Sequence, residues 1–187
     1  GSDEMVRRVN LCYPLTMRLR TMAMWLAFPE QAQAIAMAAV VGEIKDPNQA
    51  LGEGLHAIQH LLTSTMPLLV MCDRRDISGY YHTQHADAGA ALFLYDACQG
   101  GIGLADIAYQ RLESLLALAY ETATRCQCQS GCPSCIQMGS CRLRNESLSK
   151  AVAIAILSQL LGQEQESSRP ISALIDTTQR QAAGLLA

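Results

Sequence analysis

The sequence predicts an α+β fold: a helix-rich single domain with a small sheet and a cysteine-rich loop between two helices. The length of 187 residues suits one domain of ordinary size. Short apolar runs bounded by turn residues alternate with longer segments whose apolar residues recur at helical spacing. Five of the eight cysteines fall within residues 126–141, between two of these helical segments.

The N-terminal half is expected to contain a strand and two helices. Residues 21–28 are apolar with two aromatic residues and predict a strand, after which Pro29 opens an alanine-rich helix. Asp46 precedes Pro47, an order typical of an N-cap and the first turn of a second helix. We expect that helix to end before Pro67, because proline disfavours the helical conformation of the residue preceding it.

The C-terminal half is expected to contain two strands and two further helices. Residues 67–73 and 90–95 are short apolar runs that predict buried strands, with a polar loop between them. The glycine-rich residues 100–103 should turn into a helix over residues 104–119. After the cysteines, residues 148–160 have the apolar spacing of another amphipathic helix.

The predicted domain occupies residues 20–162. Residues 1–19 form an N-terminal lead-in that starts with Gly1-Ser2, which resembles the remnant of a cleaved tag. Residues 163–187 are expected to form a polar linker and a short C-terminal helix. Only 17% of the residues are charged, against about 25% in soluble proteins, which is typical of a fragment that packs against a larger partner.

Composition also limits the function. The net charge of −3 shows no overall basic excess, so any contact with DNA must be local. The sequence shows neither a secretory signal nor an apolar run that suits a membrane span. We therefore expect a cytoplasmic protein with no membrane partner, whose thiols are kept reduced.

The five clustered cysteines follow the spacing Cys126-x-Cys128-x3-Cys132-x2-Cys135-x5-Cys141. In a reducing compartment such spacing indicates a soft metal, because short loops bring four thiolates around one Zn²⁺ ion. An iron–sulfur cluster and a disulfide framework are the alternatives. Four thiolates leave no position for water or substrate, so the predicted zinc site is structural and not catalytic.

The first four cysteines form a complete ligand set by themselves. Cys141 is then an alternative ligand in place of one of the first pair. Gly131 and Pro133 flank Cys132 in a knuckle, where glycine permits an unusual backbone angle and proline fixes another in advance. Fewer conformations are then lost when the metal binds.

Two other groups could bind metal ions. Asp73, Asp76 and Asp96 follow predicted strands, and their carboxylates could hold Mg²⁺ in a metal-dependent nuclease. The alternative is structural: the first two pair with a neighbouring arginine or loop N–H groups, and Asp96 caps the glycine turn. His56 and His60 lie four residues apart on one helix face, where they could bind a metal or could simply be hydrogen-bonded histidines.

The sequence resembles the MrfA-type zinc-binding domain, found at the C-terminal end of superfamily 2 DNA-repair helicases of the DEAD/DEAH-box type. The resemblance rests on "CQCQSGCPSC" and "NESLSK", preceded in order by "TMAMWL", "GLHAIQHLL", "PLLVMCDRRDISG" and "LFLYDACQGGIGLA". Together these segments cover roughly residues 20–162. The resemblance assigns the zinc ligands to the four cysteines of residues 126–135.

The resemblance implies a non-catalytic accessory domain of an ATP-dependent DNA-repair helicase, which braces the motor and contributes to DNA binding. The chain itself has neither a phosphate-binding loop nor a DEAH-type box. Family members often read "CGNGN" where this chain reads "CRLRN", which adds Arg142 and Arg144. We expect these two arginines and Lys150 to contact DNA, in single-stranded form. The resemblance places the helicase motor in the same chain or in a partner chain. A protein-interaction scaffold of a bacterial defence system is a further alternative.

Overall fold

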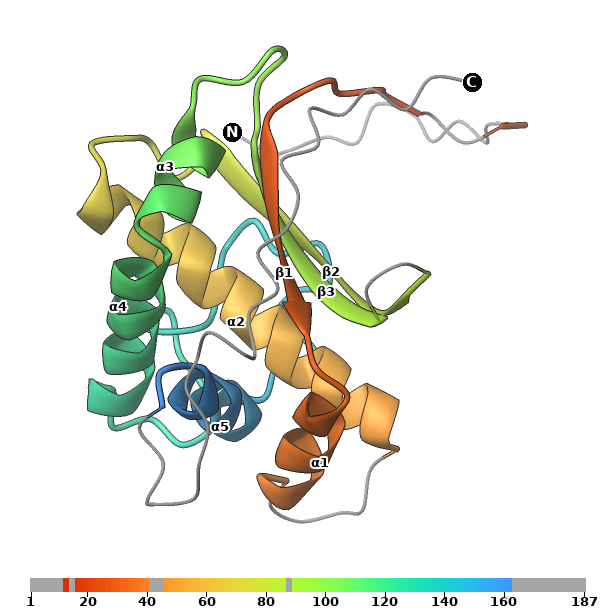
Figure 1. Cartoon of the computed structure of the whole chain (residues 1–187), viewed down its shortest axis with the longest axis vertical. Helices are drawn as coiled ribbons and strands as arrows, with labels where there is room; N and C mark the ends of the chain where they lie inside the picture. The colour runs from red at the N-terminus through yellow and green to blue at the C-terminus, as the bar shows by residue number, and fades with distance from the viewer. Residues whose placement is uncertain (1–11, 14–15, 41–45, 87–88, 163–187) are drawn as a thin grey trace, which may run out of the picture.

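The computed structural model describes residues 12–13, 16–40, 46–86 and 89–162. Within these ranges, three antiparallel strands form a sheet in the order β1-β3-β2. The strands are β1 (Ala23–Phe28), β2 (Ile77–His85) and β3 (Gly89–Asp96). The helices gather on one side of this sheet, as Figure 1 shows. The predicted helix-rich α+β fold with a small sheet is confirmed.

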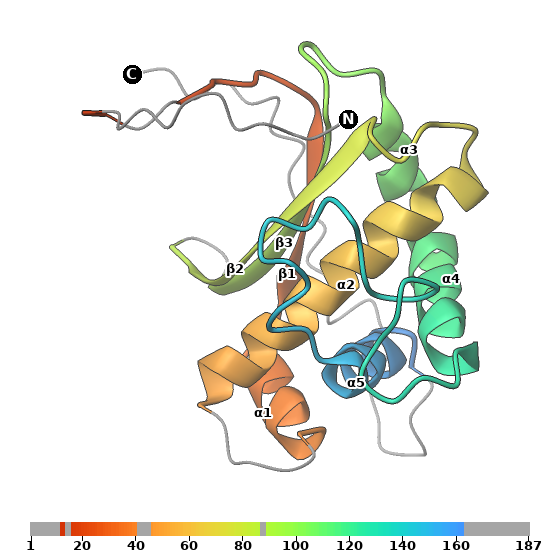
Figure 2. The same ribbon diagram turned by 180° about the vertical axis from the view of Figure 1, so that it is seen from behind.

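The long helix α2 (Pro47–Leu69) is the centre of the domain. It packs against β2 and against α1 (Gln31–Ala38), α4 (Leu112–Arg125) and α5 (Lys150–Leu160), while α3 (Leu104–Gln110) packs on β1 and β3. Fourteen of its residues are buried, so α2 supplies a large part of the core. Figure 2 shows the segment between α4 and α5 crossing over α2.

The two N-terminal predictions hold. The strand expected at residues 21–28 is β1, and the alanine-rich helix is α1. Asp46 caps α2, because its Oδ2 accepts hydrogen bonds from the backbone N–H groups of Asn48 at 3.0 Å and Gln49 at 3.1 Å. Pro47 occupies the first turn, where its missing N–H costs nothing.

The end of α2 was predicted wrongly. The helix does not stop before Pro67 but continues to Leu69, so the strand expected at residues 67–73 does not form. Pro67 lies in the last turn, where a proline removes only one backbone hydrogen bond. The backbone N–H of Val70 then closes the helix on the carbonyl of Met66 at 3.0 Å.

The polar segment predicted as a loop is strand β2. Its side chains alternate between exposed Tyr80 and His82 and half-buried Tyr81 and Thr83, the period of two that a strand requires. The sequence did not indicate a strand here because most of its side chains are polar. Such side chains suit β2, which lies at the edge of the sheet and pairs only with β3 among the described strands.

The C-terminal elements follow the prediction with one interruption. The helix expected over residues 104–119 is divided at Arg111 into α3 and α4. Helix α5 matches the amphipathic segment, and Gly162 follows it with a φ of 64°. The predicted linker and short helix of residues 163–187 lie outside the described residues. No helix within the described ranges has the length and apolar character to cross a membrane.

Candidate metal centre

The cysteine loop connects α4 to α5. Cys126 is the C-cap of α4. At the other end, the Ser149 side chain caps α5 by accepting a hydrogen bond from the backbone N–H of Val152 at 3.3 Å. A Cβ atom on Gly54 would come within 2.3 Å of Val152 Cγ1, so glycine allows α2 and α5 to pack closely beneath the loop. Both ends of the loop are therefore fixed by packed helices.

Four of the five clustered cysteines bring their sulfur atoms together. The Sγ atoms of Cys126, Cys128, Cys132 and Cys135 all lie within 4.8 Å of one another. The separations are 3.5 Å for Cys126–Cys128 and Cys126–Cys132, 3.4 Å for Cys128–Cys135 and 3.8 Å for Cys132–Cys135. A tetrahedral zinc ion with bonds of about 2.3 Å requires sulfur–sulfur distances of about 3.8 Å. A disulfide requires about 2.05 Å, so the geometry fits one shared ion.

The knuckle holds two of these sulfurs in position. Cys135 N–H donates to the carbonyl of Cys132 at 3.0 Å, and Cys132 N–H donates to Cys135 Sγ at 3.3 Å. Gly131 has a φ of 112°, and a Cβ atom there would come within 2.5 Å of Ile136. The buried Ile136 side chain thus fills the space that glycine leaves, which anchors the knuckle in the core.

Lys150 lies beside the sulfur cluster. Its side chain is only 6% exposed, and its Nζ donates to the carbonyls of Cys126 at 2.5 Å and Cys128 at 2.7 Å. A third contact, at 3.4 Å, reaches Cys128 Sγ. The residue predicted to contact DNA therefore directs its ammonium group at the thiolates, and sequence reasoning missed this role.

The thiols of the cluster differ in acidity. Burial alone would raise the pKa of Cys128, but hydrogen bonds from Cys135, Cys126 and Lys150 outweigh it and lower this pKa to about 7. Burial raises the pKa of Cys135. Without metal, Cys128 therefore holds its proton less tightly than Cys135 does, and metal binding should release protons because zinc binds the thiolate form.

The fifth cysteine lies apart from this group. Cys141 Sγ is 3.4 Å from His56 Nε2, and it groups with His56 and His60. Arg142 and Arg144 follow on the exposed part of the loop, where Arg144 forms a 3.9 Å ion pair with Glu146. The spacing of the two histidines and the surplus cysteine were visible in the sequence, but nothing there indicated that they meet.

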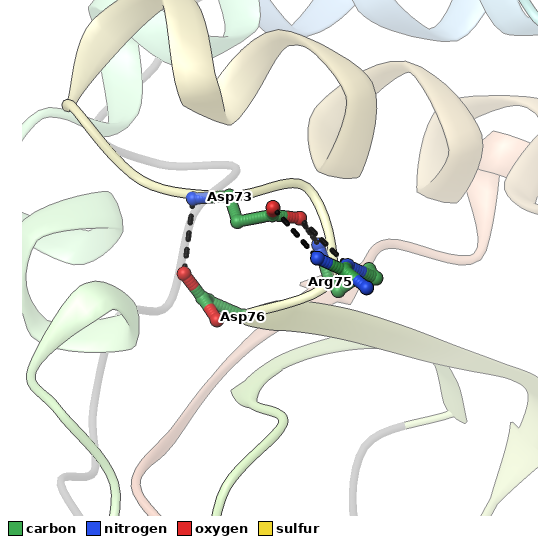
Figure 3. A network of polar contacts seen from close by, with 3 residues as sticks. All are labelled: Asp73, Arg75 and Asp76. Atoms are coloured by element: carbon green, nitrogen blue, oxygen red, sulfur yellow. Dashed lines mark hydrogen bonds and ion pairs between the residues drawn. The ribbon is translucent and has the colours of Figure 1, made fainter.

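The acidic residues are occupied by the protein's own donors. Asp73 forms an ion pair with Arg75 at 3.2 Å, and Asp76 accepts the backbone N–H of Asp73 at 2.9 Å (Figure 3). Asp96 is completely buried, and its two carboxylate oxygens accept four backbone N–H groups, of residues 102–105. These contacts are the ones that the structural interpretation of the three aspartates predicted.

The comparisons with known proteins agree with the cysteine cluster. Residues 58–136 match the family model of the MrfA Zn-binding domain. The uncharacterized protein MJ1572.1 of Methanocaldococcus jannaschii is 39% identical over 111 residues, which are 57% of this chain and 99% of that protein.

Two helicases are also related. The uncharacterized ATP-dependent helicase YprA of Bacillus subtilis is 37% identical over 100 residues, which are 50% of this chain and 13% of the helicase. The ATP-dependent helicase hrq1 of Schizosaccharomyces pombe is 32% identical over 127 residues, which are 58% of this chain and 12% of the helicase. The chain thus corresponds to a small part of each helicase. With its four-cysteine cluster suited to hold zinc, this chain belongs to the MrfA Zn-binding domain family.

Proposed function

We propose that the chain is the non-catalytic zinc-binding accessory domain of a cytoplasmic ATP-dependent DNA-repair helicase. One Zn²⁺ ion, held by Cys126, Cys128, Cys132 and Cys135, ties the end of α4 to the loop that leads into α5. The observation that carries the proposal is this closed set of four sulfurs in a chain whose relatives include helicases. A full thiolate set leaves the ion no position for chemistry.

The chain's own residues prepare this site. The helix ends fix Cys126 and the knuckle fixes Cys132 and Cys135. Lys150 places one positive charge against the thiolates, which offsets part of the repulsion between them. A bound metal would supply a cross-link between α4 and the knuckle.

The bracing of the motor is proposed for the exposed apolar side chains near the C-terminal end of α2 and on or beside α3. Leu68 and Met71 at the end of α2 are 73% and 102% exposed, and Ile102 and Tyr109 beside or within α3 are 60% and 42% exposed. The Arg111 guanidinium donates to the carbonyl of Leu69 at 3.4 Å, so the two segments are neighbours. Large exposed apolar side chains of this kind are typical of a protein interface.

The contribution to DNA binding is proposed for Arg142 and Arg144. Arg142 lines an open hollow of about 920 Å³ together with Arg74 and Arg75. Arg75 is paired with Asp73, so Arg74 and Arg142 supply the positive charge at this hollow, on a chain of net charge −3. The aromatic side chain of Tyr80 lines the same hollow and is 57% exposed, so it could stack with a nucleic-acid base.

Fluorescence anisotropy with labelled single-stranded DNA tests this role. The Arg142→Ala/Arg144→Ala variant should bind more weakly than the wild type, and its plot of log affinity against log salt should be shallower by about 1.4 for two lost phosphate contacts. Arg18→Ala/Arg20→Ala removes the same charge from exposed residues at another place and is the matched control. Equal affinities of the wild type and the loop variant would refute the DNA role.

A further inference from the structure

A second group of metal-binding side chains lies next to the four-cysteine cluster. His56 and His60 on α2 and Cys141 in the loop each place one donor atom within 4.8 Å of the other two. We propose that these three side chains bind a second zinc ion, with one coordination position open to the hollow above them. This site is independent of the proposed helicase function.

The two histidines are oriented as metal ligands are. Both side chains are buried, with exposures of 3% and 2%, and their rings are 4.5 Å apart. His56 Nδ1 lies 3.1 Å from the carbonyl of Ser147, and His60 Nδ1 lies 2.7 Å from the carbonyl of Ile136. A carbonyl can only accept, so each Nδ1 carries the hydrogen and Nε2 of the neutral ring keeps its lone pair. In metal sites the ligating histidine usually donates its other ring N–H to a carboxylate, a backbone carbonyl or a water molecule.

Cys141 is held against the histidines by its own loop. The Asn145 side chain clips this loop, since its Oδ1 accepts Met138 N–H at 2.8 Å and its Nδ2 donates to the Met138 carbonyl at 3.0 Å. Cys141 N–H also donates to that carbonyl, at 3.2 Å. The Tyr81 ring stacks on His56 with centroids 5.4 Å apart, which fixes the imidazole plane. All three ligands are therefore positioned before any metal binds.

The donor set suits zinc. Two imidazoles and one thiolate are ligands that Zn²⁺ prefers, and three protein ligands leave the fourth tetrahedral position free. His56, His60 and Cys141 all line the hollow of about 920 Å³, so a water molecule can reach that position. On binding, the Cys141 thiol gives its proton to solvent. The second site would thus leave one coordination position for water or another ligand, whereas the four cysteines would fill all four positions of the first.

A thiol–imidazole hydrogen bond between Cys141 and His56 is the alternative explanation of their 3.4 Å contact. It would explain one pair of atoms but not the approach of His60 to both. It would also need no metal. The number of zinc ions per chain separates the two explanations.

The experiment measures zinc by elemental analysis of the full chain after dialysis against metal-free buffer. The wild type should contain two zinc ions per chain and Cys141→Ser one. Cys98→Ser, a change at a half-buried cysteine in neither group, is the matched control and should keep two. One zinc in the wild type, or an unchanged count in Cys141→Ser, would overturn the proposal.

Cobalt substitution gives a second readout on the same proteins. With Co²⁺ in place of zinc, the wild type should show more thiolate-to-cobalt absorption than Cys141→Ser, because one more thiolate binds metal. Circular dichroism first establishes that Cys141→Ser is folded. If it is not, the zinc count of the wild type decides alone: two ions support the second site, and one ion removes it.

Discussion

Two connections of the chain contain side chains that could bind a metal: the cysteine loop between α4 and α5, and the turn from β3 into α3, which follows Asp96. The acidic turn uses its carboxylate internally: Asp96 accepts four backbone N–H groups. The cysteine loop leaves its sulfurs facing mainly one another, with Lys150 as the neighbouring cation. Residue type alone therefore does not indicate a metal site. What matters is whether the acceptor atoms already have donors.

The largest expected effect follows from removal of the metal from the cysteine loop. Structural zinc contributes about 10–16 kcal/mol of apparent binding free energy, while a domain's net stability is only about 5–15 kcal/mol. Cys132→Ser, or treatment with a strong chelator, should therefore abolish cooperative thermal unfolding, as monitored by circular dichroism. Cys98→Ser is the control and should unfold like the wild type. An unchanged melting curve for Cys132→Ser would mean that the loop needs no metal.

A smaller effect is expected from the acidic turn. Asp96→Ala removes the acceptor of four N–H groups at the start of α3, two of them in the buried residues Leu104 and Ala105, which should lower the free energy of unfolding by about 3 kcal/mol. Urea denaturation measures this loss, and elemental analysis should find the zinc content unchanged. A zinc content that fell with Asp96→Ala would contradict the separation of the two turns.

The sequence predicted the features that depend on neighbouring residues. Asp46-Pro47 marked the start of α2, and the short spacings from Cys126 to Cys135 predicted a cluster that the structure brings together. Such local patterns determine geometry within one turn or loop. The strand β2 was missed, because its polar side chains suit an edge strand whose pairing with β3 depends on long-range contacts.

The contacts of Cys141 and Lys150 also depend on residues far away in the sequence, so they could not be predicted from local patterns. Cys141 meets His56 across 85 positions of the sequence, and Lys150 reaches Cys126 across 24. The fifth cysteine and the histidine spacing were visible, but only the packing of the loop on α2 brings them together. A basic residue near a cysteine cluster suits both a DNA contact and a thiolate partner, and burial decides between them.

A change at Lys150 tests how much the zinc affinity of the cysteine loop depends on the positive charge beside it. Lys150→Gln keeps much of the side-chain length but removes the charge beside Cys128, and changes to partners of metal ligands commonly weaken metal binding by about 10–100-fold. Competition with a zinc-binding dye should show a loss in that range. Lys150 is buried, so single-stranded DNA binding by the zinc-loaded variant should match the wild type. A loss of DNA affinity with unchanged zinc affinity would restore the role predicted from the sequence.

The smallest expected effect concerns the loop beyond the cluster. Arg144 has a φ of 51°, in the left-handed region that favours glycine. The left-handed conformation costs a non-glycine residue roughly 1 kcal/mol, partly offset by the greater freedom of glycine in the unfolded chain. Arg144→Gly should therefore raise the free energy of unfolding by about 0.5 kcal/mol.

Arg142→Gly is the matched control, because Arg142 does not adopt a positive φ. It removes the same charge two residues earlier but relieves no strain, so it should lower the free energy of unfolding slightly. Urea denaturation of the two variants side by side therefore separates backbone strain from charge. If both changes shift stability in the same direction, the left-handed turn at Arg144 is not a source of strain.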